Sequence, residues 1–381
     1  MSGAGPQGAP AGAAPPPVGD RRQAEHARRK AERWARKGRR PRAALGFWMS
    51  LRYRVSWSLL WCICQLSRLF PVQTWVRMGG HIGRLAYHFD RERRELALRN
   101  LRKSLKGEVG RQKRQAIAIE MYRNFGRLAF EYALLLSGRR LEPYDQWVTV
   151  DNPEVARRAL ESKGAVIFVT CHGGNFEILG AWAAAHLVKL DAVMKDLRNP
   201  YTNAAVVAMR ERVGLGLIRK FPALRTILRV LRGGGSVAIL CDQRRRNRGL
   251  IVDFFGRPAA TVDTPAVLAL RFGLPILPGY SYRVGDGLEY RAVAHEPILP
   301  DLEAPRDEEV VRLTQAINDS IERFIRAHPE QWNWTQPRWR VSKRMRHRAR
   351  RRAGDEHASA VARAEAARAA EREAGGGPKP S

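Results

Sequence analysis

A single histidine occupies the position in which this sequence best supports proton transfer. In the stretch AVIFVTCHGGNFEILGAW, a short apolar run ends at Thr170, and His172 and Glu177 follow it. One imidazole nitrogen can accept a proton while a carboxylate holds the other nitrogen in place. Because no Ser or Cys stands in a nucleophile-elbow motif here, the pair suits deprotonation of a substrate hydroxyl better than formation of a covalent intermediate. We therefore expect His172 to be a general base that is oriented by Glu177.

The residues between these two side chains predict a turn that opens a helix. Gly173 and Gly174 permit a tight turn, and Asn175 is a good N-cap. Glu177 then falls in the first helical turn, where the helix dipole favours an ionised carboxylate. The backbone N–H groups of Gly173, Gly174 and Asn175 are candidate donors to a developing oxyanion. The spacing His-x-x-x-x-Glu is a weak signal in a chain with nine histidines, so a hydrogen-bonded structural histidine is the alternative.

The cysteines give no second nucleophile or metal site. Cys171 precedes His172, but adjacent residues of a strand point to opposite faces, so we expect a small buried side chain. Cys62, Cys64 and Cys241 complete a set that lacks the spacing of a zinc site or a disulfide framework. This usage is typical of a reducing compartment.

A second strand end and a basic helix supply further candidates. Asp242 follows the apolar run of SVAILCDQ, so its carboxylate is expected at the same strand-end crevice as His172. There it would position Arg210 or a substrate. The alternative is a loop acid that caps backbone groups. Arg210 lies in the predicted helix VVAMRERVG, where its guanidinium is a candidate phosphate ligand and otherwise a solvated charge. Lys195 and Arg198 are candidates of the same type.

The alternation of short apolar runs and helical patterns after residue 137 predicts an α/β fold. Apolar runs at 165–170, 236–241 and 275–282 alternate with helical patterns, which lie at 175–189, 201–213, 222–232, 262–272 and 306–328. Nearly continuous apolar strands that alternate with helices indicate a central mixed, largely parallel sheet flanked by helices. Ligands bind at the carboxyl ends of strands in such sheets, which is where the candidate residues fall.

The N-terminal part predicts a different organisation. Residues 1–45 lack large apolar groups and a secretory signal, so we expect a disordered basic tail and no export. Residues 46–70 contain an apolar run too short to span a bilayer, and their arginines and Trp48, Trp57 and Trp61 suit a membrane-interface helix; a buried helix is the alternative. Residues 71–340 would form the catalytic domain, helical up to 137, and 341–381 a second basic tail.

The net charge requires an anionic partner. The chain carries a formal charge of +31 and a pI near 11.2. Residues 21–42 contain 11 Lys/Arg, and residues 338–352 contain nine with no acid. Such segments suit anionic membrane lipids or nucleic acid. A nucleic-acid-binding protein is therefore the rival class, although the chain shows no zinc-finger or RNA-recognition signature.

At this point the sequence resembles the late acyltransferases of lipid A biosynthesis, within the lysophospholipid acyltransferase superfamily. HGGNFE at 172–177 resembles the catalytic block, and the likeness continues in order over roughly residues 50–340 through Lys195, Asn199-Pro200, Arg210, Asp242-Gln243, Phe255-Gly256, Thr264 and PEQWNW at 329–334. It departs at Gly173, where the family commonly has an aromatic residue, and at Gln336-Pro337-Arg338, where the family favours a His-Arg-Arg run.

The resemblance implies a glycerolipid acyltransferase-like fold and an O-acyltransferase activity without cofactor or metal. A fatty acyl chain would pass from acyl carrier protein or acyl-CoA to a hydroxyl of a phosphorylated glycolipid, a lipid A precursor first of all, at the cytoplasmic face of the inner membrane. Phosphatidylinositol mannosides and lysophospholipids are alternative acceptors, and hydrolysis is an alternative reaction. The expected partners are anionic membrane lipids, acyl carrier protein and the acceptor, and no nucleic acid. Trp332, Trp334 and Trp339 would line the acyl channel, sit at headgroup level or pack in the core.

Overall fold

The computed structural model describes residues 47–219, 223–245 and 249–340. The tails predicted at 1–45 and 341–381 lie outside these residues. The chain divides into two compact units, residues 1–52 and 53–381.

Helices fill the first part of the described chain, as predicted for residues 71–137. They are α2 (Phe47–Leu66), η1 (Ser67–Leu69), α3 (Val72–Phe89), α4 (Arg91–Ser104) and α5 (Arg111–Leu136). α2 begins in the first unit and ends in the second. Within the described residues, every helix is too short or too polar to cross a bilayer.

Two of these helices pack with their backbones almost in contact. Gly79 and Gly83 of α3 face Gly126 of α5, and a Cβ added at Gly126 would lie 2.2 Å from the Gly79 carbonyl oxygen. The Trp75 indole of α3 donates to the Phe130 carbonyl of α5 at 3.0 Å, and the two rings lie 4.6 Å apart. Glycines on both helices therefore permit a contact that any side chain would block.

The remaining chain builds a seven-stranded sheet in the order β1-β9-β8-β2-β5-β3-β4. The strands are β1 (Val148–Val150), β2 (Ile167–Thr170), β3 (Leu190–Met194), β4 (Gly216–Arg219), β5 (Ser236–Leu240), β8 (Ile276–Arg283) and β9 (Tyr290–Ala294). The five strands from β8 to β4 pair in parallel, β9 is antiparallel to β8, and β1 is parallel to β9. A separate antiparallel ribbon consists of β6 (Leu250–Asp253) and β7 (Pro258–Thr261).

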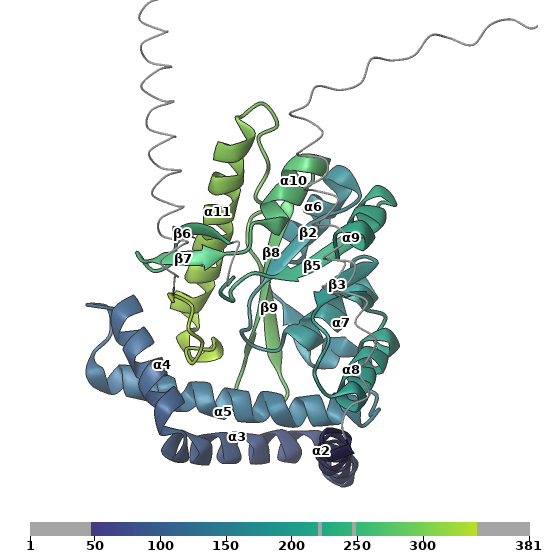
Figure 1. Ribbon diagram of the computed structural model, residues 1–381, viewed down its shortest axis with the longest axis vertical. Helices are drawn as coiled ribbons and strands as arrows, with labels where there is room; N and C mark the ends of the chain where they lie inside the picture. The colour runs from purple at the N-terminus through teal and green to yellow at the C-terminus, as the bar shows by residue number, and fades with distance from the viewer. Residues whose placement is uncertain (1–46, 220–222, 246–248, 341–381) are drawn as a thin grey trace, which may run out of the picture. The chain divides into compact units, whose positions relative to one another are not determined.

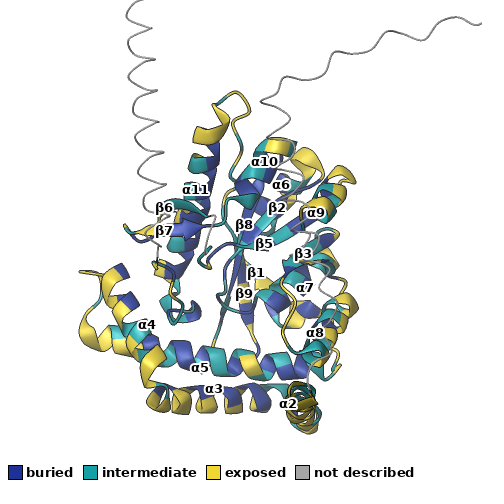
Figure 2. Cartoon of the chain, viewed as in Figure 1, coloured by how far each residue is buried: buried dark blue, intermediate teal, exposed yellow. Residues whose placement is uncertain are grey.

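Helices cover both faces of this sheet and form a three-layered body (Figure 1). One buried cluster joins the sheet to α9 (Ala223–Arg232), α10 (Thr264–Phe272) and α11 (Arg306–Ala327). Other clusters join its second face to α6 (Pro153–Lys163), α7 (Phe176–His186) and α8 (Pro200–Arg212). Figure 2 shows the strands as the buried centre of the molecule, with exposed residues on the outer helices. α5 runs along one end of the sheet, with α3 on its far side (Figure 1).

The predicted fold class is confirmed, and the differences from the sequence-based elements are local. Strands were predicted at 165–170, 236–241 and 275–282, and the structure has β2, β5 and β8 there. The pattern missed the sheet strands β1, β3, β4 and β9 and the β6–β7 ribbon, each of which has five residues or fewer, and the burial of β3 alternates residue by residue. Such short or half-buried strands lack the continuous apolar run by which the others were recognised.

Candidate active site

His172 stands two residues beyond β2 with its side chain partly open to solvent. Alternate residues of the strand point to opposite faces, so Cys171 is 1% exposed in the core, whereas the His172 side chain is 29% exposed. Burial raises the pKa of the Cys171 thiol well above its usual range. Cys171 is therefore a buried thiol, as expected, and the histidine is the group that a substrate can reach.

The carboxylate that holds the imidazole is Asp242. His172 Nδ1 lies 2.7 Å from Asp242 Oδ1. The two side chains meet because β2 and β5 are parallel neighbours with Thr170 opposite Leu240, so each residue stands two positions past its strand. The structure thus differs from the expectation that Glu177 would hold this ring.

The second oxygen of Asp242 is held by the segment that follows α11. Oδ2 accepts hydrogen bonds from Trp332 Nε1 at 2.9 Å and from Gln336 Nε2 at 3.1 Å. Asp242 is fully buried, which by itself disfavours its charge, but His172 and these two donors outweigh burial and keep the pKa of Asp242 well below its usual range. The carboxylate is therefore ionised and fixed at both oxygens.

Asp242 also sets the protonation of His172. Burial of the imidazole disfavours its charged form, but the charge and hydrogen bond of Asp242, with a further contribution from Glu177, raise the pKa of His172 above its ordinary value. An ionised carboxylate at Nδ1 fixes the proton of the neutral ring there and leaves Nε2 as the acceptor. Gln243 Nε2 lies 3.2 Å from His172 Nε2, at the position that a substrate hydroxyl must take.

Glu177 instead forms part of a second charged group. Arg210 binds it with two hydrogen bonds, one of them 2.9 Å from Nε to Oε2, and the Tyr132 hydroxyl donates to Oε1 at 2.7 Å. Glu177 is buried and Arg210 nearly so. Since its guanidinium fork is occupied by Glu177, Arg210 does not present the free phosphate ligand that the sequence suggested.

The turn after His172 has the predicted form. Gly174 has a φ of 56°, and a Cβ there would lie 1.9 Å from the Ser281 carbonyl oxygen, so only glycine fits. A Cβ at Gly173 would lie 2.9 Å from Phe324, which accounts for the missing aromatic residue. The Gly174 N–H donates to the Gln331 carbonyl at 3.2 Å and is therefore not free to bind an oxyanion.

Asn175 caps α7 and ties it to a buried network. Its Oδ1 accepts from the N–H groups of Glu177 and Ile178, both at 3.1 Å, as the N-cap prediction requires. Its Nδ2 donates to Glu131 Oε2 at 2.8 Å. Glu131 is fully buried, and it also accepts from the Tyr290 hydroxyl at 2.8 Å and pairs with Arg283. α5 and two strands thereby fix the helix that starts at the site.

The other predicted residues lie away from the dyad or in the core. Lys195 and Arg198 are exposed in the loop after β3, and within the described part of the chain neither forms an ion pair. Trp332 and Trp334 are fully buried, and Trp339 stacks on Phe254 with ring centroids 5.9 Å apart. Trp334 and Trp339 therefore pack in the core, whereas Trp332 also holds Asp242 through its indole N–H.

An apolar cavity of about 100 Å³ lies between the sheet and α7. Its walls are mostly aliphatic and include Phe168, Leu179, Ala238, Leu277 and Val293, whereas Glu177 and Arg210 form its polar part. Phe176 also lines it, and the Phe176 ring lies 5.3 Å from that of His172. Phe176 thus adjoins both the cavity and the imidazole ring.

A family model described as bacterial lipid A biosynthesis acyltransferase matches residues 45–341. The chain belongs to this family. Phosphatidylinositol mannoside acyltransferase of Mycobacterium tuberculosis is 27% identical over 180 residues, 46% of this chain and 54% of that protein, so the chain spans about half the length of this relative. Lipid A biosynthesis myristoyltransferase of Escherichia coli is 27% identical over 257 residues, 66% of this chain and 77% of that protein. In a solved structure, the 1-acyl-sn-glycerophosphate acyltransferase of Thermotoga maritima matches 74% of this chain and 99% of its own at 12% identity, with a TM-score of 0.34.

Sequence reasoning missed several residues of this family member's site. Gln336 and the indole N–H of Trp332 hold Asp242, and Glu131 and Tyr132 hold Asn175 and Glu177. The only available signal was that the PEQWNW segment forms part of the family likeness. No spacing rule could have paired these residues, because their contacts span 44 to 94 positions of the chain.

Proposed function

We propose that this chain is a membrane-associated O-acyltransferase that moves a fatty acyl group from a thioester to a hydroxyl of a phosphorylated glycolipid. The observation that carries the proposal is the buried, ionised Asp242 on His172 Nδ1. Nε2 meets the exposed Gln243 amide, which a substrate hydroxyl would displace, and Phe176 beside the ring lines an apolar cavity. Membership of the lipid A acyltransferase family supports acyl transfer as the reaction.

In this mechanism His172 Nε2 takes the proton of the acceptor hydroxyl as its oxygen attacks the thioester carbonyl. The tetrahedral intermediate collapses, the carbon–sulfur bond breaks, and the imidazolium returns the proton to the departing thiolate. Asp242 stabilises the imidazolium and holds the ring in the correct tautomer. The first carbons of the acyl chain would enter the cavity that Phe176 lines, because its volume of about 100 Å³ is too small for a whole fatty chain. General-base catalysis of this type contributes about 10²- to 10⁴-fold.

The remaining predicted residues receive supporting roles. Glu177 and Arg210 form the polar rim of the acyl cavity, and the charge of Glu177 helps to keep His172 basic. The N–H groups of Gly173 and Asn175, with the Gln243 amide, are the proposed donors to the oxyanion. Lys195 and Arg198, which are exposed beyond the neighbouring strand, are proposed to meet the phosphate of the acceptor.

The names of the family and of two relatives support two candidate acceptors. The family name and the Escherichia coli relative favour a lipid A precursor, and the mycobacterial relative favours a phosphatidylinositol mannoside as the second candidate. The donor is acyl carrier protein or coenzyme A in thioester form, and the reaction takes place at the cytoplasmic face of the inner membrane.

The test is acyl transfer by purified His172→Ala, with wild type and Arg158→Ala as controls. Arg158 is an exposed residue whose ion pair with Glu296, at 3.8 Å, lies outside the site. Each donor is offered with each acceptor class, and the products are identified by mass spectrometry. We expect a loss of about 10²-fold or more only in the histidine variant. Wild-type activity in a His172→Ala protein with a normal melting temperature would refute the mechanism, and fast acyl release without acceptor would identify a hydrolase.

A further inference from the structure

Helix α3 presents an apolar row to solvent on the side that α5 does not cover. Met78, Ile82, Leu85 and Phe89 are 36%, 52%, 57% and 79% exposed. Their spacing of four, three and four residues places them on one line of the helix. The buried residues of α3, such as Trp75, form a separate face against α5. Four large apolar side chains in a row are an unusual surface for a helix that already has a packed face.

A basic row runs beside the apolar one. Arg77, His81, Arg84 and His88 are exposed and repeat the same spacing one residue earlier, about 100° around the helix. α3 contains no Asp or Glu, and within the described residues none of these four forms an ion pair. The solvent side of α3 therefore has an apolar half and a half with two arginines, two histidines and no acid, which is the pattern of helices that lie in a membrane interface.

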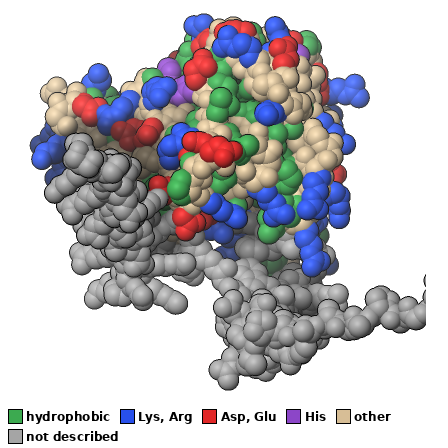
Figure 3. Space-filling model, turned by 90° about the horizontal axis from the view of Figure 1, so that it is seen from above, with side chains coloured by type: hydrophobic (Ala, Val, Ile, Leu, Met, Phe, Trp, Pro, Cys, Tyr) green, Lys and Arg blue, Asp and Glu red, His purple; other side chains and the backbone are tan. Residues whose placement is uncertain are grey.

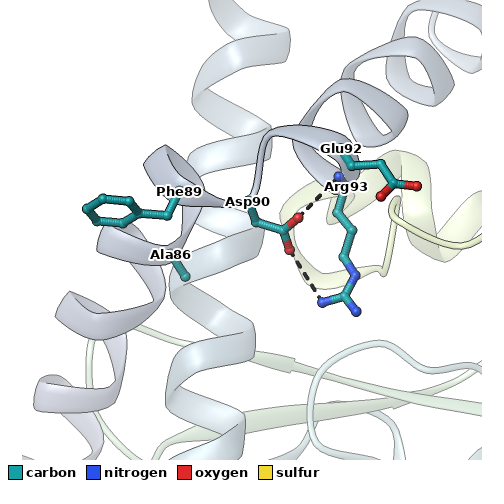
Figure 4. Close-up of a pocket in the computed structure, with 5 residues that line it drawn as sticks. All are labelled: Ala86, Phe89, Asp90, Glu92 and Arg93. Atoms are coloured by element: carbon teal, nitrogen blue, oxygen red, sulfur yellow. Dashed lines mark hydrogen bonds and ion pairs between the residues drawn. The ribbon is translucent and has the colours of Figure 1, made fainter.

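Neighbouring elements extend this surface. α2 leads into α3, and its second-unit part with η1 exposes further apolar side chains, between 45% and 78%: Leu59, Trp61, Ile63, Leu66 and Leu69. Asp90 lies at the end of the apolar row, but Arg93 neutralises it at 3.3 Å and Phe89 points away from the pair (Figure 4). The open depression at this corner is lined by this ion pair and by the exposed Glu92 (Figure 4).

The opposite side of the molecule differs in charge. Figure 3 shows the face turned away from α3, where acidic side chains are interspersed with Lys and Arg. A cationic surface free of acids is therefore a property of α3 and not of the whole exterior.

We propose that the solvent face of α3 docks on an anionic phospholipid bilayer, with the helix axis parallel to the membrane plane. The apolar row enters the boundary between headgroups and acyl chains, and the arginines meet lipid phosphates. A second copy of the chain fits less well, because a symmetric contact would bring the basic rows together. This inference rests on the membrane association in the proposed function and names the surface that would make it, and vesicle binding can fail while acyl transfer to a solubilised acceptor is retained.

Docking through α3 also sets the position of the active site relative to the membrane. α5 contacts α3 on one side through Gly126 and Phe130, and on the other it reaches the site through Glu131 and Tyr132. One helix therefore separates the membrane face from the residues that hold α7.

Vesicle flotation of the full chain tests the proposal without measuring acyl transfer. We expect Ile82→Gln/Leu85→Gln to bind phosphatidylglycerol/phosphatidylcholine vesicles about tenfold or more weakly than wild type. Leu224→Gln is the matched control, because Leu224 is a helical residue with 58% exposure on α9. Arg77→Gln/Arg84→Gln should weaken binding to these anionic vesicles about tenfold and leave binding to pure phosphatidylcholine unchanged.

A labelled variant reports on α3 even if other segments also bind lipid. In a Cys62→Ser background the other native cysteines are buried, so Ile82→Cys can carry a polarity-sensitive fluorophore. Vesicles should shift its emission to the blue, whereas a label at Leu224→Cys should not respond. No shift at position 82 would overturn the proposal. A wild-type dimer in sedimentation that the Ile82→Gln/Leu85→Gln change dissociates, with unchanged vesicle binding, would overturn it in favour of a second copy.

Discussion

At the residue scale, the site depends on a carboxylate that is held more firmly than its histidine. Both oxygens of Asp242 have fixed donors, whereas His172 keeps a partly exposed ring with one nitrogen toward substrate. A buried charge is tolerated when its hydrogen bonds are complete. Buried residues therefore fix the orientation of the imidazole, and its exposed side carries out the proton transfer.

The pH profile of acyl transfer should report this pair. The base must be neutral, so kcat/KM should fall as the pH falls through the raised pKa of His172. In Asp242→Asn the charge and hydrogen bond that mainly raise this pKa are removed, while burial, which lowers it, and the smaller contribution of Glu177 remain. We expect the acid limb to move to lower pH and the rate at its plateau to drop about 10²- to 10⁴-fold.

Asp145→Asn is the control for this profile. Asp145 also pairs with a histidine, His186 at 3.1 Å, but outside the site. Its variant should keep the wild-type profile. An acid limb that stays in place in Asp242→Asn would show that Asp242 does not set the basicity of His172.

A second prediction concerns the indole that holds Asp242. Trp332→Phe removes one hydrogen bond to the carboxylate, and we expect kcat to fall about tenfold because the imidazole is less firmly oriented. Trp334→Phe is closely matched: Trp334 is equally buried, but its indole donates to the Pro329 carbonyl at 2.7 Å. Both variants should lose similar stability in thermal unfolding, and only the first should lose kcat. If kcat fell equally in both variants, the hydrogen bond from Trp332 to Asp242 would have no role of its own in catalysis.

At the element scale, helices α3 and α5 form a rigid base under one end of the sheet. Glycines on both helices bring the backbones together, and the opposite side of α5 carries Glu131 and Tyr132 to the start of α7. A change in the contact between α3 and α5 should therefore lower the free energy of unfolding first and disturb the site only indirectly, through α5.

Gly126→Ala tests this contact. The added Cβ would meet the Gly79 carbonyl oxygen at 2.2 Å and Gly83 Cα at 2.7 Å, so the helices must separate. We expect the free energy of unfolding in urea to drop by about 1–3 kcal/mol. Gly279→Ala is the control, since no atom lies within 4 Å of its added Cβ. If both variants unfolded at the same urea concentration as wild type, the close packing would not contribute to stability.

At the scale of the whole molecule, the most basic segments are separate in sequence from the residues of the proposed mechanism. The dyad, the network behind it and the cavity all lie within residues 130–340, whereas the densest basic segments lie in the sequence before residue 43 and after residue 337. The residues of the proposed mechanism are therefore separate in sequence from the densest basic segments.

Removal of residues 1–42 and 341–381 tests this separation. We expect the shortened chain to keep the acyl-transfer rate on a detergent-solubilised acceptor, because no side chain of the proposed mechanism is removed. A titration with duplex DNA at several salt concentrations is the companion measurement. Tight, salt-dependent binding by the shortened chain, with no acyl transfer, would support the nucleic-acid rival instead.

The sequence by itself determined what depends on neighbours along the chain. The strand that ends at Thr170, the glycine turn, the Asn175 cap and the alternation of strands and helices are local, because dihedral preferences and apolar periodicity act over a few residues. The histidine at the strand end was predictable for the same reason.

Only the tertiary structure decided which carboxylate serves His172. Glu177 is near in sequence, but α7 directs it toward Tyr132 and Arg210. Asp242 is 70 residues away and becomes the partner because β5 lies next to β2 in matching register. The order of strands in a sheet follows from packing across the whole core, and no local pattern contains it.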